Sequence, residues 1–95
     1  MSAYIIVQIN ITNKEPYKEY LNQVTPIVKK FGGKYIVRGG KYKTMLGKWD
    51  YDRTVVIKFP NYDIAIQWYN SEEYALVKKI REDNSVGNLI IIEGL

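Results

Sequence analysis

The chain has 95 residues, enough for one domain that buries only roughly 60 to 70 per cent of the surface its unfolded form exposes, so its stability margin is thin. Hydrophobic residues make up 46% of it and charged residues 25%, which are globular proportions and exclude disordered and fibrous classes. It contains no cysteine and no histidine, which excludes disulfides, thiolate and imidazole metal sites, and Ser-His or Cys-His catalysis.

The net charge of +4 is unevenly distributed along the chain. Residues 1–50 carry nine Lys and Arg against three Asp and Glu, whereas residues 51–95 carry five against seven. The basic residues of the first half gather at Lys29, Lys30, Lys34, Arg38, Lys41, Lys43 and Lys48. Such a patch attracts anionic partners, but it is sparse beside the footprints of nucleic-acid-binding modules. We therefore favour a solvated, lysine-rich hairpin over nucleic-acid binding.

The first residues argue against export and against membrane insertion. The apolar run from Tyr4 to Val7 ends at Gln8, and no basic leader precedes it. The run is too short for a signal peptide core or a membrane span. We therefore expect a cytoplasmic protein without a membrane partner.

Residues 4–11 are rich in β-branched side chains and predict a strand whose two faces both carry apolar groups. One face should hold Ile5, Val7, Ile9 and Ile11, and the other Tyr4, Ile6, Gln8 and Asn10. A helix should follow, with Pro16 in its first turn and apolar residues at helical spacing as far as Phe31. Pro26 lies inside this stretch, so we expect a bend, or a restart of the helix with Thr25 as a new cap. Gly32-Gly33 then supplies a permissive helix end.

Two-residue alternation returns at Lys34, is interrupted by Gly39-Gly40 and resumes as far as Leu46. This pattern predicts one long, bent strand with a bulge or a close backbone approach at the glycines. Residues 47–52 should form a turn, and residues 54–59 the third strand, which Pro60 ends.

Two helices and a last strand complete the predicted order. Asn61 is suited to cap a short helix, and Ser71 to cap the next one. We expect a turn over 84–88 and the last strand over 89–92. The order β-α-β-β-α(α)-β over residues 1–95 predicts a single α+β domain, a ferredoxin-like sandwich with a four-stranded antiparallel sheet and all helices on one face.

The other face of the predicted sheet would be uncovered. Because the first and last strands are apolar on both faces, that face would expose far more contiguous apolar surface than a soluble monomer usually does. A homodimer that packs sheet against sheet is the simplest cover. The alternative is a monomer in which Gln8, Asn10 and Lys58 keep the face sufficiently polar.

Three arginines lie in or beside apolar stripes, where lysine would be the cheaper surface choice: Arg38, Arg53 and Arg81. Arginine binds carboxylates and phosphates with two parallel hydrogen bonds, which suits an anionic or enolate ligand. The alternative, which we favour at this point, is internal ion pairing with Asp50, Asp52 or Glu93.

Aromatic residues surround the break between the two later helices, where Trp68, Tyr69 and Tyr74 flank Ser71. Aromatic walls with a few hydroxyls often enclose small ligands, although packing of a core or a dimer interface is the commoner role. The candidate ligand-binding residues are Arg38, Arg53, Trp68, Tyr69, Ser71 and Tyr74, and the candidate catalytic residues are Tyr4, Arg38, Trp68, Tyr74 and Arg81. We expect no metal and no cofactor.

Several segments together resemble a known family: Pro16-Tyr17-x-x-Tyr20, Gly32-Gly33-x-Tyr35-x-Val37-Arg38-Gly39-Gly40, Asp52-Arg53 leading to Phe59-Pro60, and Trp68-Tyr69-x-Ser71-x-x-Tyr74. The chain resembles the domain of unknown function thirteen-thirty, in the dimeric α+β barrel superfamily. The resemblance implies that fold and a dimer, but no activity. The superfamily includes cofactor-independent monooxygenases, isomerases and haem enzymes, of which those that depend on histidine are not models for this chain.

Three functions remain open from the sequence. The first is a homodimer that binds a small anionic or aromatic metabolite. The second is a cofactor-independent monooxygenase or isomerase that acts on a small cyclic or phenolic substrate, with a closed pocket lined by Tyr4, Arg38, Trp68 and Tyr74. The third is a non-catalytic structural or interaction dimer, in which these side chains pack solidly and the arginines form internal ion pairs.

Overall fold

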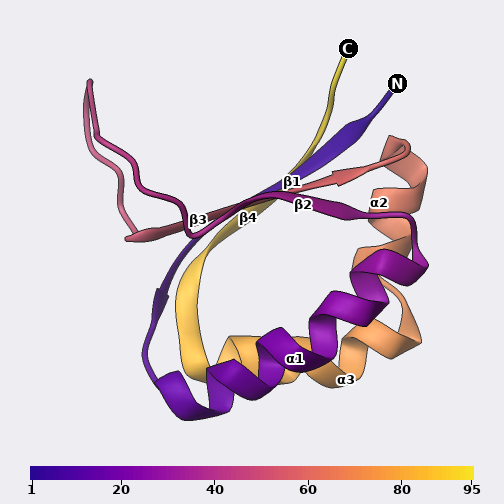
Figure 1. Cartoon of the computed structure of the whole chain (residues 1–95), viewed down its shortest axis with the longest axis horizontal. Coiled ribbons are helices and arrows are strands. Elements are labelled where there is room, and N and C mark those ends of the chain that lie inside the picture. Colours follow the sequence, from indigo (N-terminus) through magenta and orange to yellow (C-terminus); the bar gives the residue numbers. More distant parts are fainter.

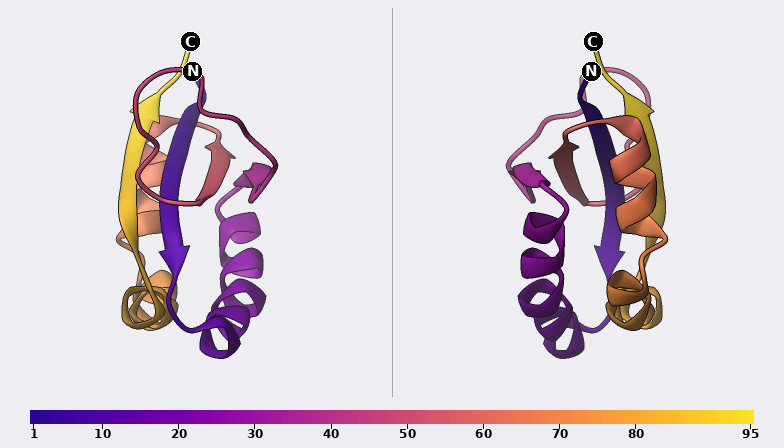
Figure 2. Two further views of the ribbon diagram at one scale, coloured as in Figure 1. Left: turned by 90° about the vertical axis from the view of Figure 1, so that its left-hand side faces the viewer. Right: turned by 90° about the vertical axis from the view of Figure 1, so that its right-hand side faces the viewer.

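A four-stranded antiparallel sheet forms one layer of the molecule, and helices pack against one of its faces (Figure 1). The computed structural model describes residues 1–95. Its elements are β1 (Ala3–Ile11), α1 (Lys14–Lys30), β2 (Lys34–Arg38), β3 (Arg53–Phe59), α2 (Tyr62–Tyr69), α3 (Glu72–Asn84) and β4 (Ser85–Glu93). The strands lie in the order β2-β3-β1-β4, which the views of Figure 2 show across the sheet. The fold is the predicted ferredoxin-like α+β arrangement.

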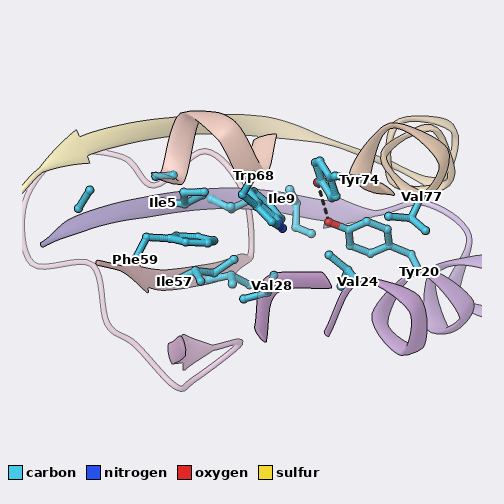
Figure 3. Close-up of a cluster of buried hydrophobic side chains, with 14 of the residues drawn as sticks. Ile5, Ile9, Tyr20, Val24, Val28, Ile57, Phe59, Trp68, Tyr74 and Val77 are labelled. Carbon is cyan, nitrogen blue, oxygen red and sulfur yellow. Dashed lines mark hydrogen bonds between the residues drawn. The ribbon is translucent and has the colours of Figure 1, made fainter. Parts of the chain in front are cut away.

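The central strand β1 determines the two faces of the sheet. Its residues alternate between buried and half-buried, and the buried set faces the helices: Ala3, Ile5, Val7 and Ile9. Against them pack Trp68 of α2, Tyr74 of α3 and Val24 of α1, which are each about 1% exposed or less (Figure 3). The predicted faces of the first strand are therefore confirmed, and the helix-facing side forms the core.

The long second strand predicted through Leu46 is wrong. Strand β2 ends at Arg38, and residues 39–52 form a loop without regular secondary structure. Gly39 adopts a φ of 72° and donates its N–H to the carbonyl of Thr54, which turns the chain out of the β ladder. The bulge lies earlier than expected, between Tyr35 and Val37.

The last strand is longer than predicted. It begins at Ser85 directly after α3, so the predicted turn over 84–88 is wrong. The reason is its pairing with β1, which runs without interruption from Ile11 opposite Ser85 to Ala3 opposite Glu93. Backbone pairing with a central strand outweighs the turn propensity of Asn84, Gly87 and Asn88.

Helix α1 continues through Pro26, so the predicted restart at Thr25 does not occur. The hydroxyl of Thr25 instead donates to the carbonyl of Leu21 at 2.8 Å, within the same helix. Proline removes only one hydrogen bond here, and the buried side chains of Val24 and Val28 on either side hold the helix against the sheet. The predicted caps are confirmed at the other two helices, because Asn61 accepts the N–H of Ile64 and Ser71 that of Tyr74.

The face of the sheet opposite the helices, which we call the open face, is apolar as predicted. Tyr4 and Ile6 of β1 lie on it, beside Val56 of β3 and the exposed Ile90 and Ile92 of β4. Because both neighbours of β1 contribute apolar groups, the surface is continuous across three strands. None of the three helices combines the length and the apolar character that spanning a membrane requires.

Gly33 is a position where the core leaves no space for a side chain. A Cβ there would lie 2.7 Å from both Phe59 Cε1 and Val28 Cγ1, which are core atoms with no room to move. We predict that Gly33→Ala lowers the free energy of unfolding by about 2 kcal/mol, or roughly 10 °C in Tm. Gly40→Ala is the matched control, because its Cβ would be no closer than 3.9 Å to any atom. Equal denaturant unfolding curves for the two variants would contradict this account.

Candidate functional site: an arginine–tyrosine cavity

A cavity of about 30 Å³ lies between the helix-facing side of the sheet and the helices. Its sheet side consists of aliphatic residues, namely Ile5, Val7, Val55, Ile57 and Leu89. Its aromatic wall comes from the three helices and from β2: Tyr17 and Tyr20 of α1, Tyr35 of β2, Trp68 of α2 and Tyr74 of α3. Leu21 of α1 and three arginines, namely Arg38, Arg53 and Arg81, complete the lining. We call this site the arginine–tyrosine cavity.

Arg38 reaches the cavity because of the bulge in β2. On the far side of the bulge Val37 pairs with Val56, which lies on the open face, and Arg38 pairs with Val55, which faces the helices. The bulge therefore brings Arg38 to the same side as Tyr35. The guanidinium carbon lies 4.0 Å from the centroid of the Tyr35 ring, and Nη2 donates to Thr25 Oγ1 at 2.8 Å.

Arg53 begins β3, and its guanidinium lies over the backbone of Gly39. A Cβ at Gly39 would collide with Arg53 Nη1, so the glycine makes room for the arginine. This is the close backbone approach that the Gly39-Gly40 pair predicted. The Nε atom of Arg53 is buried and has no hydrogen-bond partner.

Arg81 enters the cavity from the last turn of α3. Its Nη2 donates to the hydroxyl of Tyr69 at 3.4 Å, and its guanidinium carbon lies 5.9 Å from the centroid of the same ring. These are weak contacts for a charged group. Arg81 is therefore positioned by the helix and only loosely held by Tyr69.

None of the three arginines forms an ion pair. The ion pairs of the molecule join lysines to carboxylates on the surface, and the predicted partners Asp50, Asp52 and Glu93 form none with arginine. The lining also contains no Asp or Glu. The cavity thus carries concentrated positive charge without a counter-charge, the arrangement that attracts an anion.

The tyrosines of the cavity form a connected cluster of neutral hydroxyls. The Tyr20 and Tyr74 hydroxyls share a hydrogen bond of 2.8 Å, and the Trp68 ring stacks on Tyr74 with centroids 4.2 Å apart (Figure 3). Burial raises the pKa of Tyr74 to about 12 and raises that of Tyr20 further, with the neighbouring Tyr74 adding to the effect. Burial also raises the pKa of Tyr17 and Tyr35, against the opposing effect of nearby arginines. At neutral pH these hydroxyls are proton donors and not bases.

Two buried side-chain donors in the molecule lack a partner, Arg53 Nε and Trp68 Nε1, and both residues line the cavity. Figure 3 shows the indole nitrogen of Trp68 at the end of the ring nearest the Tyr20–Tyr74 hydroxyl pair. A buried N–H without an acceptor costs about 1 to 3 kcal/mol, so such groups in native proteins usually serve a bound molecule or water. Both donors need an acceptor.

The structure brings together five of the predicted site residues, namely Arg38, Arg53, Trp68, Tyr74 and Arg81. Tyr69 supports Arg81 from outside the cavity. Ser71 has a structural role, because it caps α3 and donates to the carbonyl of Trp68. Tyr4 pairs with Lys58 and Ile92 on the open face, so its predicted place in the cavity is wrong.

The candidate site residues predicted from the sequence do not include Tyr17, Tyr20 or Tyr35, although Tyr35 belongs to the aromatic residues near the central hairpin. Tyr17 and Tyr20 lie three residues apart, on neighbouring positions of one face of α1. Their hydroxyls were the available signal, because a purely apolar stripe requires none. No cluster of three potential metal ligands occurs in the structure.

The family model described as "Domain of unknown function (DUF1330)" matches residues 2–95. Among solved structures, the RPA0582 protein of unknown function from Rhodopseudomonas palustris is similar with a TM-score of 0.74 and 17% identity, over 99% of this chain and 82% of that one. No functionally curated protein matches the sequence.

Two more distant structures share the fold. SnoaB, a cofactor-independent oxygenase from Streptomyces nogalater, has a TM-score of 0.57 and 11% identity, over 99% of this chain and 93% of that one. A protein of the ethyl tert-butyl ether (EthD) family from Bacillus halodurans has a TM-score of 0.57 and 16% identity, over 100% of this chain and 99% of that one. At these identities the likeness shows the fold alone.

The raised tyrosine pKa values predict a stability loss at high pH. Above pH 10 the unfolded chain releases phenolic protons that the native cavity retains, so stability falls as pH rises from 10 to 12, on the order of 2 kcal/mol for Tyr74 alone. Ultraviolet titration should show that four of the nine tyrosines ionise only as the protein unfolds. Titration of all nine near pH 10 in the folded protein would refute the buried cluster.

Proposed function

We propose that this chain, which belongs to the DUF1330 family, is a homodimeric protein that binds a small organic anion in the arginine–tyrosine cavity. The observation that carries the proposal is the convergence of three guanidinium groups without a carboxylate partner on a cavity that also holds the unpaired N–H groups of Arg53 and Trp68. A carboxylate or enolate oxygen would satisfy these donors. Charge-assisted hydrogen bonds of this kind are worth roughly twice a neutral one.

The remaining lining suits an organic ligand. Eleven of the fourteen lining residues are hydrophobic or aromatic, so the arginines are the only charged groups in the lining. An apolar environment strengthens the attraction between a guanidinium and a carboxylate because it lowers the local dielectric. Few, convergent polar groups in an apolar wall are typical of small-molecule sites.

Binding is favoured over the enzymatic alternative. The structural neighbour SnoaB is named as a cofactor-independent oxygenase, and the cavity offers groups that would stabilise an enolate, namely the arginines and the neutral Tyr20 and Tyr74 hydroxyls. However, the lining contains no Asp, Glu, His or Lys, and the pKa values of Tyr20 and Tyr74 are raised, so no side chain there is suited to abstract a proton at neutral pH. The purely structural alternative would require paired arginines, which are absent.

The second part of the proposal is that two chains pack through their open faces. Tyr4, Ile6, Val56, Ile90 and Ile92 would otherwise leave a continuous apolar surface in water. The loop of residues 39–52 stands out on the side away from α1 and α3 (Figure 1), and it carries the exposed Met45 and Leu46. A two-fold partner on the open face would cover both surfaces.

For anion binding we predict that benzoate binds the wild-type protein and that Arg53→Met weakens its affinity at least tenfold, since one charge-assisted hydrogen bond is worth about 1.5 to 3 kcal/mol. Isothermal titration calorimetry measures this directly. Lys79→Met is the control, because Lys79 is an exposed cation on the surface of α3. Benzamide, which has the same shape and no charge, should not bind. Equal benzoate affinity of the wild type and of Arg53→Met would contradict the proposal.

For the dimer we predict that light scattering after gel filtration gives twice the 11.1 kDa chain mass, and that Ile90→Glu gives a folded monomer. Ile90 is 53% exposed in the single chain, so the substitution disturbs the assembly and not the core. Leu76→Glu is the matched control, because Leu76 is 80% exposed on α3, away from the open face. A monomeric wild type, or an Ile90→Glu variant that stays dimeric, would contradict the open face as the interface.

A further inference from the structure

A groove of about 300 Å³ lies beside the cavity, between β4 and the ends of α2 and α3. The groove and the cavity share three lining residues, Val7, Arg81 and Leu89. We propose that the ligand lies across Arg81, with its anionic group in the cavity and its body in this groove. The ligand class is then an elongated monoanion, such as an arylalkanoate with a neutral polar group at its far end. This inference rests on the proposed anion binding and adds where the rest of the ligand lies.

Size is the first argument. A cavity of 30 Å³ has space for about two water molecules, which is comparable to one carboxylate group and too small for an aromatic ring. A ligand whose carboxylate occupies the cavity must therefore extend outside it. The groove is about ten times larger and begins at the same guanidinium.

The weak hold on Arg81 is the second argument. Its only hydrogen bond to another side chain is the 3.4 Å contact with the Tyr69 hydroxyl, and no carboxylate fixes it. Small rotations of its side chain would join the two spaces without breaking an ion pair. Arg81 is therefore able to bind the carboxylate while the chain of the ligand passes beside it.

The groove has two chemical sides. Val7, Ile9 and Leu89 on the helix-facing side of the sheet provide an apolar floor, next to Tyr69. Glu82, which is exposed, and the half-exposed Ser85 provide hydrogen-bonding groups. The apolar floor suits a ring, and the polar groups suit a hydroxyl. The charge of Glu82 would repel a second anionic group, which favours a monoanion over a dianion.

A second groove, of about 340 Å³, adjoins Arg53 on another side and includes Lys14 and Asp52. It shares only Arg53 with the cavity, whereas the groove at Arg81 shares three residues. The groove at Arg81 is therefore more closely joined to the cavity and is the favoured place for the body of the ligand. Substitutions at Glu82 and Lys14 distinguish the two routes.

The test uses acetate and para-hydroxyhydrocinnamate as probes in calorimetric titrations of the full chain. We expect the longer anion to bind at least tenfold more tightly than acetate. Glu82→Trp, which fills the groove at an exposed helix position, should remove the advantage of the longer anion over acetate. Glu82→Gln, which removes only the charge, should bind the longer anion about threefold more tightly, in the range expected for a partly exposed charge.

The outcomes separate this inference from the proposed function. If para-hydroxyhydrocinnamate binds no better than acetate, or if Glu82→Trp leaves its advantage intact, the groove is not part of the site. If Lys14→Trp removes the advantage instead, the body of the ligand lies in the groove at Arg53 and the inference is overturned. In each of these cases a loss of acetate binding in Arg53→Met would still support anion binding in the cavity. Unchanged acetate binding in Arg53→Met would refute the proposed function as well.

Discussion

Positive charge without a counter-charge is the constraint on which this structure depends. Three guanidinium groups lie at the junction of the sheet and the helical layer, and none has a carboxylate partner. Arg53 and Arg81 are half-buried and Arg38 is exposed, so water still reaches these charges, and the surrounding backbone determines where each one lies. A bulge turns Arg38 inward, Gly39 gives room to Arg53, and the last turn of α3 presents Arg81. Local irregularities of the backbone thus serve one charged site.

The same constraint explains the chemistry of the tyrosines. Packed between arginines and aliphatic side chains, they keep their protons because burial disfavours the phenolate. Neutral hydroxyls and cationic guanidiniums are all donors to an anion, and no group of the lining accepts a proton from a substrate at neutral pH. The site is therefore built to bind and stabilise negative charge. Any reaction there would require a substrate that ionises by itself.

The fold was predictable from the sequence because strands and amphipathic helices show as periodic patterns of apolar residues. Alternation in residues 4–11 identified both faces of β1, and Asn61 and Ser71 marked the helix starts. The prediction was wrong where a local preference of the chain competes with tertiary packing or strand pairing. At Asn84–Asn88 the turn residues lost to pairing with β1, and at Pro26 one missing hydrogen bond lost to the packing of a long helix.

The site was only partly predictable for a different reason. Arg38, Arg53 and Arg81 stood out because arginine is an unusual choice beside apolar residues, but their pairing depends on distances that the sequence does not contain. Tyr4 lies on the open face, as the alternation along residues 4–11 predicts, and a residue of that face cannot line a cavity on the helix side of the sheet. Tyr17, Tyr20 and Tyr35 come from two elements that meet only in the folded protein.

The most direct test of an anion site is nuclear magnetic resonance of the two indole N–H groups during a benzoate titration. The chain has two tryptophans, and Trp49 provides an internal reference because its Nε1 already donates to Thr54 Oγ1 at 2.9 Å. The account predicts that the Trp68 indole resonance moves in a saturable way, as its unpaired N–H gains an acceptor, while that of Trp49 stays in place. A Trp68 resonance that does not respond to benzoate, or a shift confined to Trp49, would contradict it.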